Sequence, residues 1–166
     1  MMSRIVRPSI AAACLIGLTA CDGKKTDTAA PAPAPFPAAA AASGDLSPFE
    51  LENGIGPVKE KIVLGPADKN LAHKGQEVFE AKCTACHKMG EKYVGPALGE
   101  VTTRRTPTFI MNMVLNPQEN IERHPVVKQL VAEHMTFMAN QNLSVDEARA
   151  VVEYLRTQAR GTVKTQ

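Results

Sequence analysis

The stretch Cys83-Thr84-Ala85-Cys86-His87 decides how the rest of this chain is interpreted. Its two thiols are the only cysteines beyond residue 21, because the other two of the four, Cys14 and Cys21, lie near the N-terminus. A single C-x-x-C pair cannot provide the disulfide framework that holds many small exported domains together. The pair must therefore have another use, and the histidine that follows it narrows the choice.

The order C-x-x-C-H is the attachment sequence for c-type haem. Two thiols at this spacing can add to the two vinyl groups on one edge of a porphyrin, and the histidine then supplies one axial nitrogen to the iron. We therefore predict one covalently bound haem, held by Cys83 and Cys86, with His87 as the proximal axial ligand.

Two other uses of a C-x-x-C pair stay open at this point. A thiol–disulfide redox pair normally follows a strand in a βαβ unit, and the sequence shows no convincing strand alternation. A metal-binding module for zinc usually needs a second pair of Cys or His ligands at suitable spacing, and His73 stands alone. Both uses fit the sequence less well than haem does.

The first twenty residues have the pattern of an export signal. Two arginines form a positive n-region, and residues 10–18 form an apolar stretch that is too short to span a bilayer. The signal ends in Leu18-Thr19-Ala20-Cys21, which resembles a bacterial lipobox. We therefore expect removal of residues 1–20 as a lipoprotein signal peptide, lipidation of Cys21 and anchoring to a membrane surface. Asp22 resembles an inner-membrane retention signal.

The mature chain divides into four segments. Residues 21–44 begin at the lipidated Cys21, are rich in Ala and Pro, and predict a disordered tether. Residues 45–69 are interrupted by Gly and Pro, and we expect a strap on the surface of the domain with a short extended piece at 58–64. Residues 70–160 form the globular domain, and residues 161–166 form a tail.

Charge and composition limit the partners. The whole chain has 19 basic and 17 acidic residues, a formal net charge of +2, and loss of the signal removes Arg4 and Arg7 but no acidic residue. The mature polypeptide is therefore close to neutral, which gives no reason to expect nucleic acid or an acidic substrate. Aromatic residues make up only 4% of the chain and Trp is absent, so a large cofactor would supply apolar bulk.

Helical periodicity dominates the globular part, which we predict to be all-α with four to five short helices. Thr106-Pro107 has the sequence of an N-cap followed by proline in the first turn, and Ser144-Val145-Asp146-Glu147 has that of a capping box. Asp68 or Asn70 is the candidate cap of the first helix. The apolar positions place helices at about 70–82, 107–116, 125–133 and 145–157.

The stretch from Leu71 to Leu155 resembles a class I cytochrome c. Gly75 and Phe79 precede the first motif cysteine by eight and four residues, as in the N-terminal helix of that family. Val151 and Tyr154 match the apolar–aromatic pair of its C-terminal helix. The resemblance implies a cytochrome c fold in which these two helices cross closely at Gly75, around one covalent haem c.

The Gly-Pro-x-Leu pattern of that family is matched by Gly95-Pro96-Ala97-Leu98. In the family, the proline carbonyl accepts the second ring N–H of the haem-ligating histidine, which orients the imidazole and increases its basicity. The resemblance therefore implies a hydrogen bond between the Pro96 carbonyl and His87. Arg104 and Arg105 either pair with a haem propionate or are solvated.

The sixth iron ligand is the most open choice. A thioether stabilises ferrous over ferric iron, and the family places its methionine before the last helix. Met138-Ala139-Asn140-Gln141-Asn142-Leu143-Ser144 resembles the bacterial pattern Met-Pro-Asn-x-x-Leu-Ser, with alanine in place of proline. We therefore favour Met138 as the distal ligand and keep Met135 and His134 as alternatives. Otherwise we expect His134, like His73 and His124, on the surface or in a loop.

These features predict an electron-transfer protein and not an enzyme. Coordination by histidine and methionine would leave the iron without an open site, so we expect no small-molecule substrate. A haem enzyme or gas sensor with a vacant or weakly held sixth position is the alternative.

The expected partners are redox proteins of a respiratory chain, with a quinol-oxidising complex upstream and a terminal reductase or oxidase downstream. Residues 95–117 and 140–155 resemble monohaem cytochromes encoded beside nitrous oxide reductase genes, which makes that reductase the first expected acceptor. We expect the lipoprotein on the periplasmic side of a bacterial membrane, the inner membrane in particular, and no nucleic acid partner.

Overall fold

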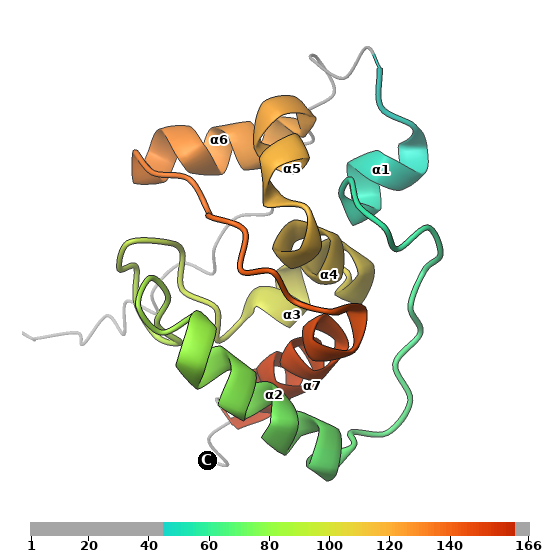
Figure 1. Ribbon diagram of the computed structural model, residues 1–166, viewed down its shortest axis with the longest axis vertical. Helices are drawn as coiled ribbons and strands as arrows, with labels where there is room; N and C mark the ends of the chain where they lie inside the picture. Colours follow the sequence, from blue (N-terminus) through green and yellow to red (C-terminus); the bar gives the residue numbers. More distant parts are fainter. Residues whose placement is uncertain (1–44, 162–166) are drawn as a thin grey trace, which may run out of the picture. The chain divides into compact units, whose positions relative to one another are not determined.

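Helices make up all of the regular secondary structure that the computed structural model shows between residues 45 and 161, the part of the chain that it describes (Figure 1). The all-α class predicted from the sequence is therefore confirmed. The expected signal peptide, the lipid site Cys21, the tether up to residue 44 and residues 162–166 of the tail lie outside the described residues. In chain order the helices are α1 Pro48–Asn53, α2 Lys69–Lys82, α3 Val101–Arg104, α4 Pro107–Leu115, α5 Pro117–Arg123, α6 Pro125–His134 and α7 Val145–Gly161.

Three helices begin at capping residues that the sequence indicates. The Asp68 carboxylate accepts main-chain N–H bonds of 2.9 and 3.0 Å in the first turn of α2. The Thr106 hydroxyl accepts one of 3.0 Å in the first turn of α4. Before α7, Ser144 and Glu147 exchange bonds of 2.8 and 3.1 Å, which complete the predicted capping box. Each contact satisfies an N–H group that the first turn of a helix leaves unpaired.

The described part contains seven helices where the sequence predicts four to five, and the additional ones are short. α1 and α3 have six and four residues, too few to show an apolar repeat. α5 begins at Pro117, directly after Asn116, where α4 ends. The proline that ends one helix therefore opens the next, because its fixed backbone angle suits the first turn of a helix.

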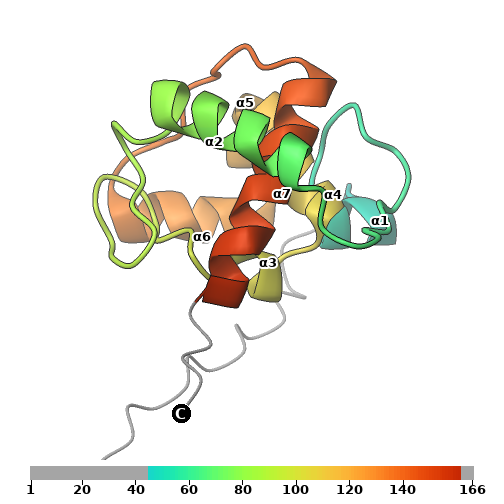
Figure 2. The same cartoon turned by 90° about the horizontal axis from the view of Figure 1, so that it is seen from below.

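The core forms where α2 crosses α7 (Figure 2). A Cβ atom at Gly75 would lie 1.9 Å from the Ala150 carbonyl oxygen, so only glycine permits this close approach. Beside the crossing, the rings of Phe79 and Tyr154 have centroids 5.4 Å apart. The crossing expected at Gly75 is confirmed. α4 completes the core with the buried side chains of Ile110, Met111 and Val114.

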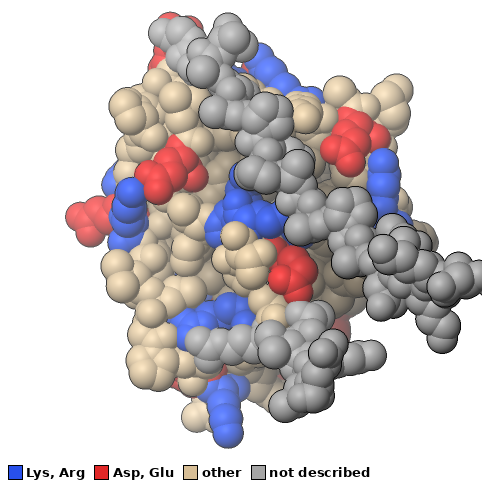
Figure 3. Space-filling view, turned by 180° about the vertical axis from the view of Figure 1, so that it is seen from behind, with Lys and Arg blue, Asp and Glu red and all other residues tan. Residues whose placement is uncertain are grey.

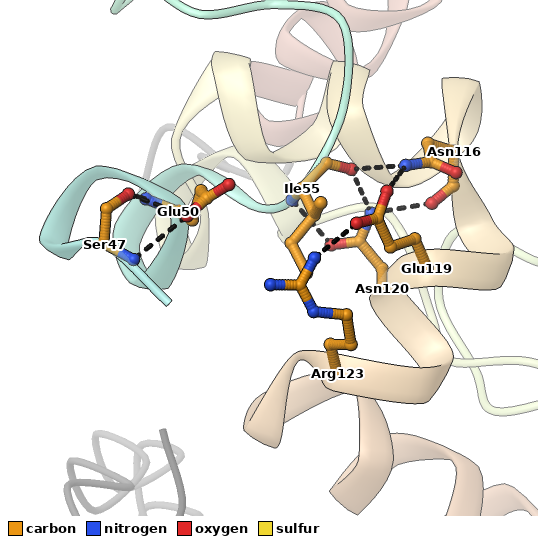
Figure 4. Close-up of polar contacts among 7 residues, drawn as sticks. All are labelled: Ser47, Glu50, Ile55, Asn116, Glu119, Asn120 and Arg123. Atoms are coloured by element: carbon orange, nitrogen blue, oxygen red, sulfur yellow. Dashed lines mark hydrogen bonds and ion pairs between the residues drawn. The ribbon is translucent and has the colours of Figure 1, made fainter. Parts of the chain in front are cut away.

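Residues 54–58 are held by an asparagine ladder, which we define as Asn112, Asn116 and Asn120, spaced four residues apart. The Ile55 N–H donates to Asn120 Oδ1 at 2.9 Å, and the Ile55 carbonyl accepts from Asn116 and Asn120 (Figure 4). The Val58 N–H donates to Asn112 Oδ1 at 3.0 Å, and the Asn112 amide donates back to the Val58 carbonyl at 3.0 Å. Amide side chains thus replace the main-chain partners that a strand would have had.

Further along the segment leading to α2, Thr108 of α4 binds the main chain of Glu60 and Ile62, and α7 fixes residues 65–68. The Asp68 N–H donates to Glu153 at 2.8 Å, and Arg156 donates to the Gly65 carbonyl at 2.7 Å. Glu153 is itself buried and pairs with Arg149 at 2.8 Å. Residues 58–64, expected to be extended, contain neither helix nor strand.

The surface strap predicted for residues 45–69 is therefore partly wrong. It begins with α1, and residues 53–56 are buried. Burial is possible because the main-chain groups of Asn53, Gly54 and Ile55 have hydrogen-bond partners. Figures 1 and 2 both show residues 45–69 on the opposite side of α7 from the loop that carries the C-x-x-C-H motif.

His124 corrects a second expectation. It is not a surface residue but is fully buried, with its ring edge-on to Phe109 at a centroid distance of 5.3 Å. Its Nε2 lies 3.2 Å from the Leu51 carbonyl oxygen, so the ring joins α1 to the start of α6. Burial, the largest cause, lowers the pKa of His124, so the neutral ring is the form that fits this place.

The described surface shows no dominant sign of charge on the face in Figure 3, where basic and acidic side chains are interspersed. Between residues 45 and 161, no helix is long and apolar enough to cross a membrane.

Candidate functional site

The C-x-x-C-H motif forms one helical turn at the end of α2. The N–H groups of Cys86 and His87 donate to the Cys83 carbonyl at 3.1 and 2.9 Å. Residues four apart on such a turn lie on the same side, so the turn brings Cys83 and His87 to one face. Both cysteines are free thiols, Cys83 buried and Cys86 exposed.

The electrostatics of Cys83 argue against a thiol–disulfide redox pair. Burial, the largest cause, raises the pKa of this thiol to about 11, although the positive charge of Lys82 acts in the opposite direction. Reactive redox cysteines instead have lowered pKa values and a thiolate at neutral pH. Residues 45–161 also contain no strand that could begin a βαβ unit.

His87 is oriented by the carbonyl that the sequence analysis paired with it. Its Nδ1 lies 2.9 Å from the Pro96 carbonyl oxygen, so Nδ1–H is the donor and Nε2 is left as the acceptor. Burial lowers the pKa of His87, which favours the neutral imidazole that metals bind. A Cβ atom on Gly95 would lie 2.5 Å from the ring carbon Cε1, so glycine is required beside this imidazole.

The two candidate methionine ligands differ in their surroundings. Both belong to the methionine loop, which we define as residues 135–143 between α6 and α7. Met138 is half-buried and packs against the hydrophobic core. Met135 ends α6 in a left-handed conformation with φ of 53°, and 87% of it is exposed. Only Met138 is therefore directed toward the interior.

His134, expected on the surface or in a loop, is the last residue of α6, and its side chain is buried. Its side chain is 5% exposed, and its Nδ1 has no hydrogen-bond partner among the described residues. A positive charge on the His134 ring would lower the pKa of His87, so the two rings are close enough to interact electrostatically. A buried polar nitrogen without a partner costs free energy.

The two arginines after the Gly-Pro-x-Leu stretch have protein partners. The Arg104 guanidinium donates to the Ala97 carbonyl at 3.0 Å and is exposed. The Arg105 guanidinium carbon lies 5.3 Å from the centroid of the Phe109 ring. Arg104 thus steadies the stretch that contains Pro96.

The residues present fit a covalently attached haem better than a bare metal ion. Two free thiols and an oriented imidazole belong to one turn, as thioether attachment and axial ligation require. In contrast, no group of three or more His, Cys, Asp or Glu side chains within residues 45–161 could hold a metal ion. The metal-binding module therefore finds no support in the described part of the chain.

Sequence reasoning missed two lysines that join the halves of this site. Lys82 Nζ lies 3.3 Å from the Gln141 carbonyl oxygen, and Lys92 Nζ lies 3.1 Å from the Glu133 carbonyl oxygen. Gly95 and the buried His134 complete the set of residues whose surroundings the sequence did not reveal. A lysine that binds a distant main-chain carbonyl has no sequence signature.

Comparisons with known proteins agree with this geometry. A sequence model of the family described as "Cytochrome c" matches residues 72–159, more than half of the chain. A cytochrome c-553-like protein of Synechocystis sp. is 35% identical over 51 residues, which are 30% of this chain and 49% of that protein. The matched part thus spans about half the length of this curated relative.

Two solved structures are similar over most of the described chain. A cytochrome c from Rhodothermus marinus is 49% identical, with a TM-score of 0.66, and the match covers 70% of this chain and 100% of that one. An engineered cytochrome c from the same organism, Rma TDE, is also 49% identical, with a TM-score of 0.64 and coverage of 69% and 99%.

Proposed function

The chain belongs to the cytochrome c family, and from this premise we propose that it carries single electrons between redox proteins. Family membership implies one covalently bound haem c, consistent with a domain of this size. The observation that carries the proposal is the single turn that holds Cys83, Cys86 and His87, with the imidazole oriented by Pro96.

The roles of the residues follow from this turn. Cys83 and Cys86 would form the two thioether bonds, and His87 Nε2 would bind the iron while Nδ1–H stays on the Pro96 carbonyl. Haem supplies an iron that alternates between the ferric and ferrous states. The protein contributes the axial ligands, the low dielectric around them and the surface at which a partner docks.

Met138 is the proposed sixth ligand. Its half-buried side chain, packed against the core, supports this assignment, whereas the exposure of Met135 speaks against the alternative. His134 stays a competitor because it is buried and has a free Nδ1. With His87 and Met138 both as ligands, the iron would have no open position, which is why we propose a carrier and no catalytic activity.

The partners and location are further parts of the proposal, and they rest on the sequence. Lipidation at Cys21 would anchor the protein on the periplasmic side of a bacterial inner membrane. The upstream partner would be a quinol-oxidising complex, and the downstream partner a terminal reductase or oxidase, with nitrous oxide reductase first. Such encounters are small and weak, and a lipid anchor raises the effective concentration of membrane partners.

Absorption spectra of the signal-processed protein, matured with a haem attachment system, test the function and the ligand. We expect sharp c-type bands on reduction and a weak far-red sulfur-to-iron band in the oxidised form. Met138→Ala should abolish the far-red band, and Met135→Ala is the matched control because it removes a methionine from the same loop.

Each of the other outcomes would indicate a different ligand or a different function. A band that disappears in Met135→Ala alone would move the ligand to Met135. Loss of the haem bands themselves would contradict the central proposal and favour a thiol or metal-binding protein. Carbon monoxide or cyanide binding to the native protein at once, without loss of a ligand, would favour the enzyme or gas-sensor alternative.

A further inference from the structure

The methionine loop has few hydrogen bonds to the rest of the molecule. Its own bonds are local: Gln141 Nε2 donates to the Ala139 carbonyl at 3.1 Å, and the Asn142 N–H donates to Asn140 Oδ1 at 2.8 Å. Among the described residues, no main-chain to main-chain hydrogen bond joins residues 136–143 to a segment across the molecule. The position of the loop therefore depends on side chains.

Two lysines reach the methionine loop and the end of α6 before it from the half of the domain that carries the C-x-x-C-H motif. Lys82, the last residue of α2, donates to the Gln141 carbonyl at 3.3 Å. Lys92, in the loop after the motif, donates to the Glu133 carbonyl at 3.1 Å. Glu133 precedes the methionine loop and Gln141 lies near its end, so the two lysine contacts bracket Met138.

The remaining contacts of the loop are weak. Met138 and Leu143 are only partly buried against the core. Met135 and Phe137 are 87% and 73% exposed and contribute little apolar burial. Hydrogen bonds from a charged donor contribute more than neutral ones, so the two ammonium groups supply a large share of what fixes the loop.

We propose that Lys82 and Lys92 are positioning residues for the sixth ligand. Lys82 holds the methionine loop near its end, Lys92 holds the last turn of α6 that leads into the loop, and together they keep Met138 on the iron. The inference rests on the proposed function, because it requires a haem whose sixth ligand is Met138. The Lys82 contact is partly buried and the Lys92 contact is exposed. Lys82 therefore contributes more, since water and salt weaken the exposed contact.

The rate at which carbon monoxide binds the ferrous holoprotein measures how often Met138 leaves the iron. We expect the rate to rise about tenfold in Lys82→Met and about threefold in Lys92→Met, from the loss of one charged hydrogen bond each. Methionine keeps most of the apolar stem of lysine and removes only the donor and the charge. Lys82→Arg keeps both and should restore a rate close to that of the unmodified protein.

Lys88→Met is the matched control for charge. Lys88 lies in the same region, with its Nζ 5.1 Å from the centroid of the Tyr93 ring, and is exposed. It should leave the carbon monoxide rate unchanged. An equal increase in Lys88→Met would overturn the proposal, because positive charge and not the contact would then control the loop.

The far-red band shows whether a negative result contradicts this inference alone or also the assignment of Met138 as ligand. A native protein with the band, together with unchanged rates in Lys82→Met and Lys92→Met, overturns the inference alone. A native haem protein without the band removes Met138 as ligand and overturns the inference together with that assignment. Increased rates in both variants, an unchanged control and rescue by Lys82→Arg support it.

Discussion

The two sides of α7 are held together by different means. On the side of residues 45–69, the asparagine ladder satisfies the main-chain groups of a buried segment, and α7 fixes its end through Glu153 and Arg156. On the side of the methionine loop, the contacts of Lys82 and Lys92 are the main polar links.

The difference distinguishes a region whose polar groups are satisfied by the polypeptide alone from a region that a bound haem would stabilise. Residues 53–56 are buried, with hydrogen-bond partners supplied by the chain. The methionine loop instead exposes Met135 and Phe137 and has little to bind except the opposite half of the site. Regions that serve function are commonly the less stable part of a fold, and here the haem would add stability by binding the folded state.

The largest effect is expected from Cys83→Ala combined with Cys86→Ala, which removes both attachment points. Haem should be completely absent from the denatured protein on a gel stained for haem, because no covalent bond remains. The methionine-loop side should lose order first, while the amide of Ile55 stays protected from hydrogen exchange by Asn120. Haem that stays attached after denaturation would contradict the site.

Asn120→Ala tests the other side. It removes the partner of the buried Ile55 N–H and one of the two donors to the Ile55 carbonyl, and we expect the free energy of unfolding to fall by about 3 kcal/mol. Denaturant titration measures this value. Asn70→Ala, at an exposed position of α2, is the control and should change it by less than about 0.5 kcal/mol. A changed far-red band in Asn120→Ala would show that the two sides are not independent.

His124 predicts a dependence on pH that belongs to the asparagine-ladder side. Its pKa in the folded state is lowered by burial, so below about pH 6.5 the unfolded chain binds a proton that the folded chain rejects. Stability is therefore complete above that pH and decreases as the pH falls toward the folded-state pKa, by at most about 1.4 kcal/mol per pH unit. Unfolding titrations of the holoprotein from pH 7 to pH 5 should show a smaller slope in His124→Gln. If the slope of stability against pH is unchanged in His124→Gln, the proton taken up on unfolding binds another group.

The smallest effect is expected from Arg123→Ala. Arg123 forms an ion pair with Glu119, and both side chains are 41% exposed (Figure 4). Because exposed pairs at this spacing are weak and screened by salt, the loss should be about 0.3 kcal/mol and vanish in high salt. A loss comparable to that of Asn120→Ala would mean that this ion pair stabilises the fold as much as the buried amides do.

The features that the sequence predicts well have local causes. The C-x-x-C-H motif, the caps at Thr106 and Ser144, and the small residue at Gly75 can each be identified within a few neighbouring residues. Pro96 was identified only because a resemblance supplied its role. These features place the helices at the core and the turn that holds the three haem-attachment residues.

The features that the sequence does not reveal depend on distant pairs. Val58 and Asn112 are separated by 54 positions, and Lys82 and Gln141 by 59. An asparagine or lysine has the same identity whether it is solvated or bonded to a remote carbonyl. The burial of His124 and His134 was missed for the same reason, because each is enclosed by segments that only the tertiary fold brings together.

The asparagine ladder has a consequence for how this protein can vary. Its amides bind only the main-chain N–H and carbonyl groups of Ile55 and Val58, and not their side chains. Every residue except proline has both of these groups. Gly56 is the exception, since a Cβ atom there would lie 2.4 Å from Asn112 Oδ1. In a saturation library we therefore expect Pro57 and Lys59, both exposed, to accept many residue types, while position 56 and the three asparagines accept almost none.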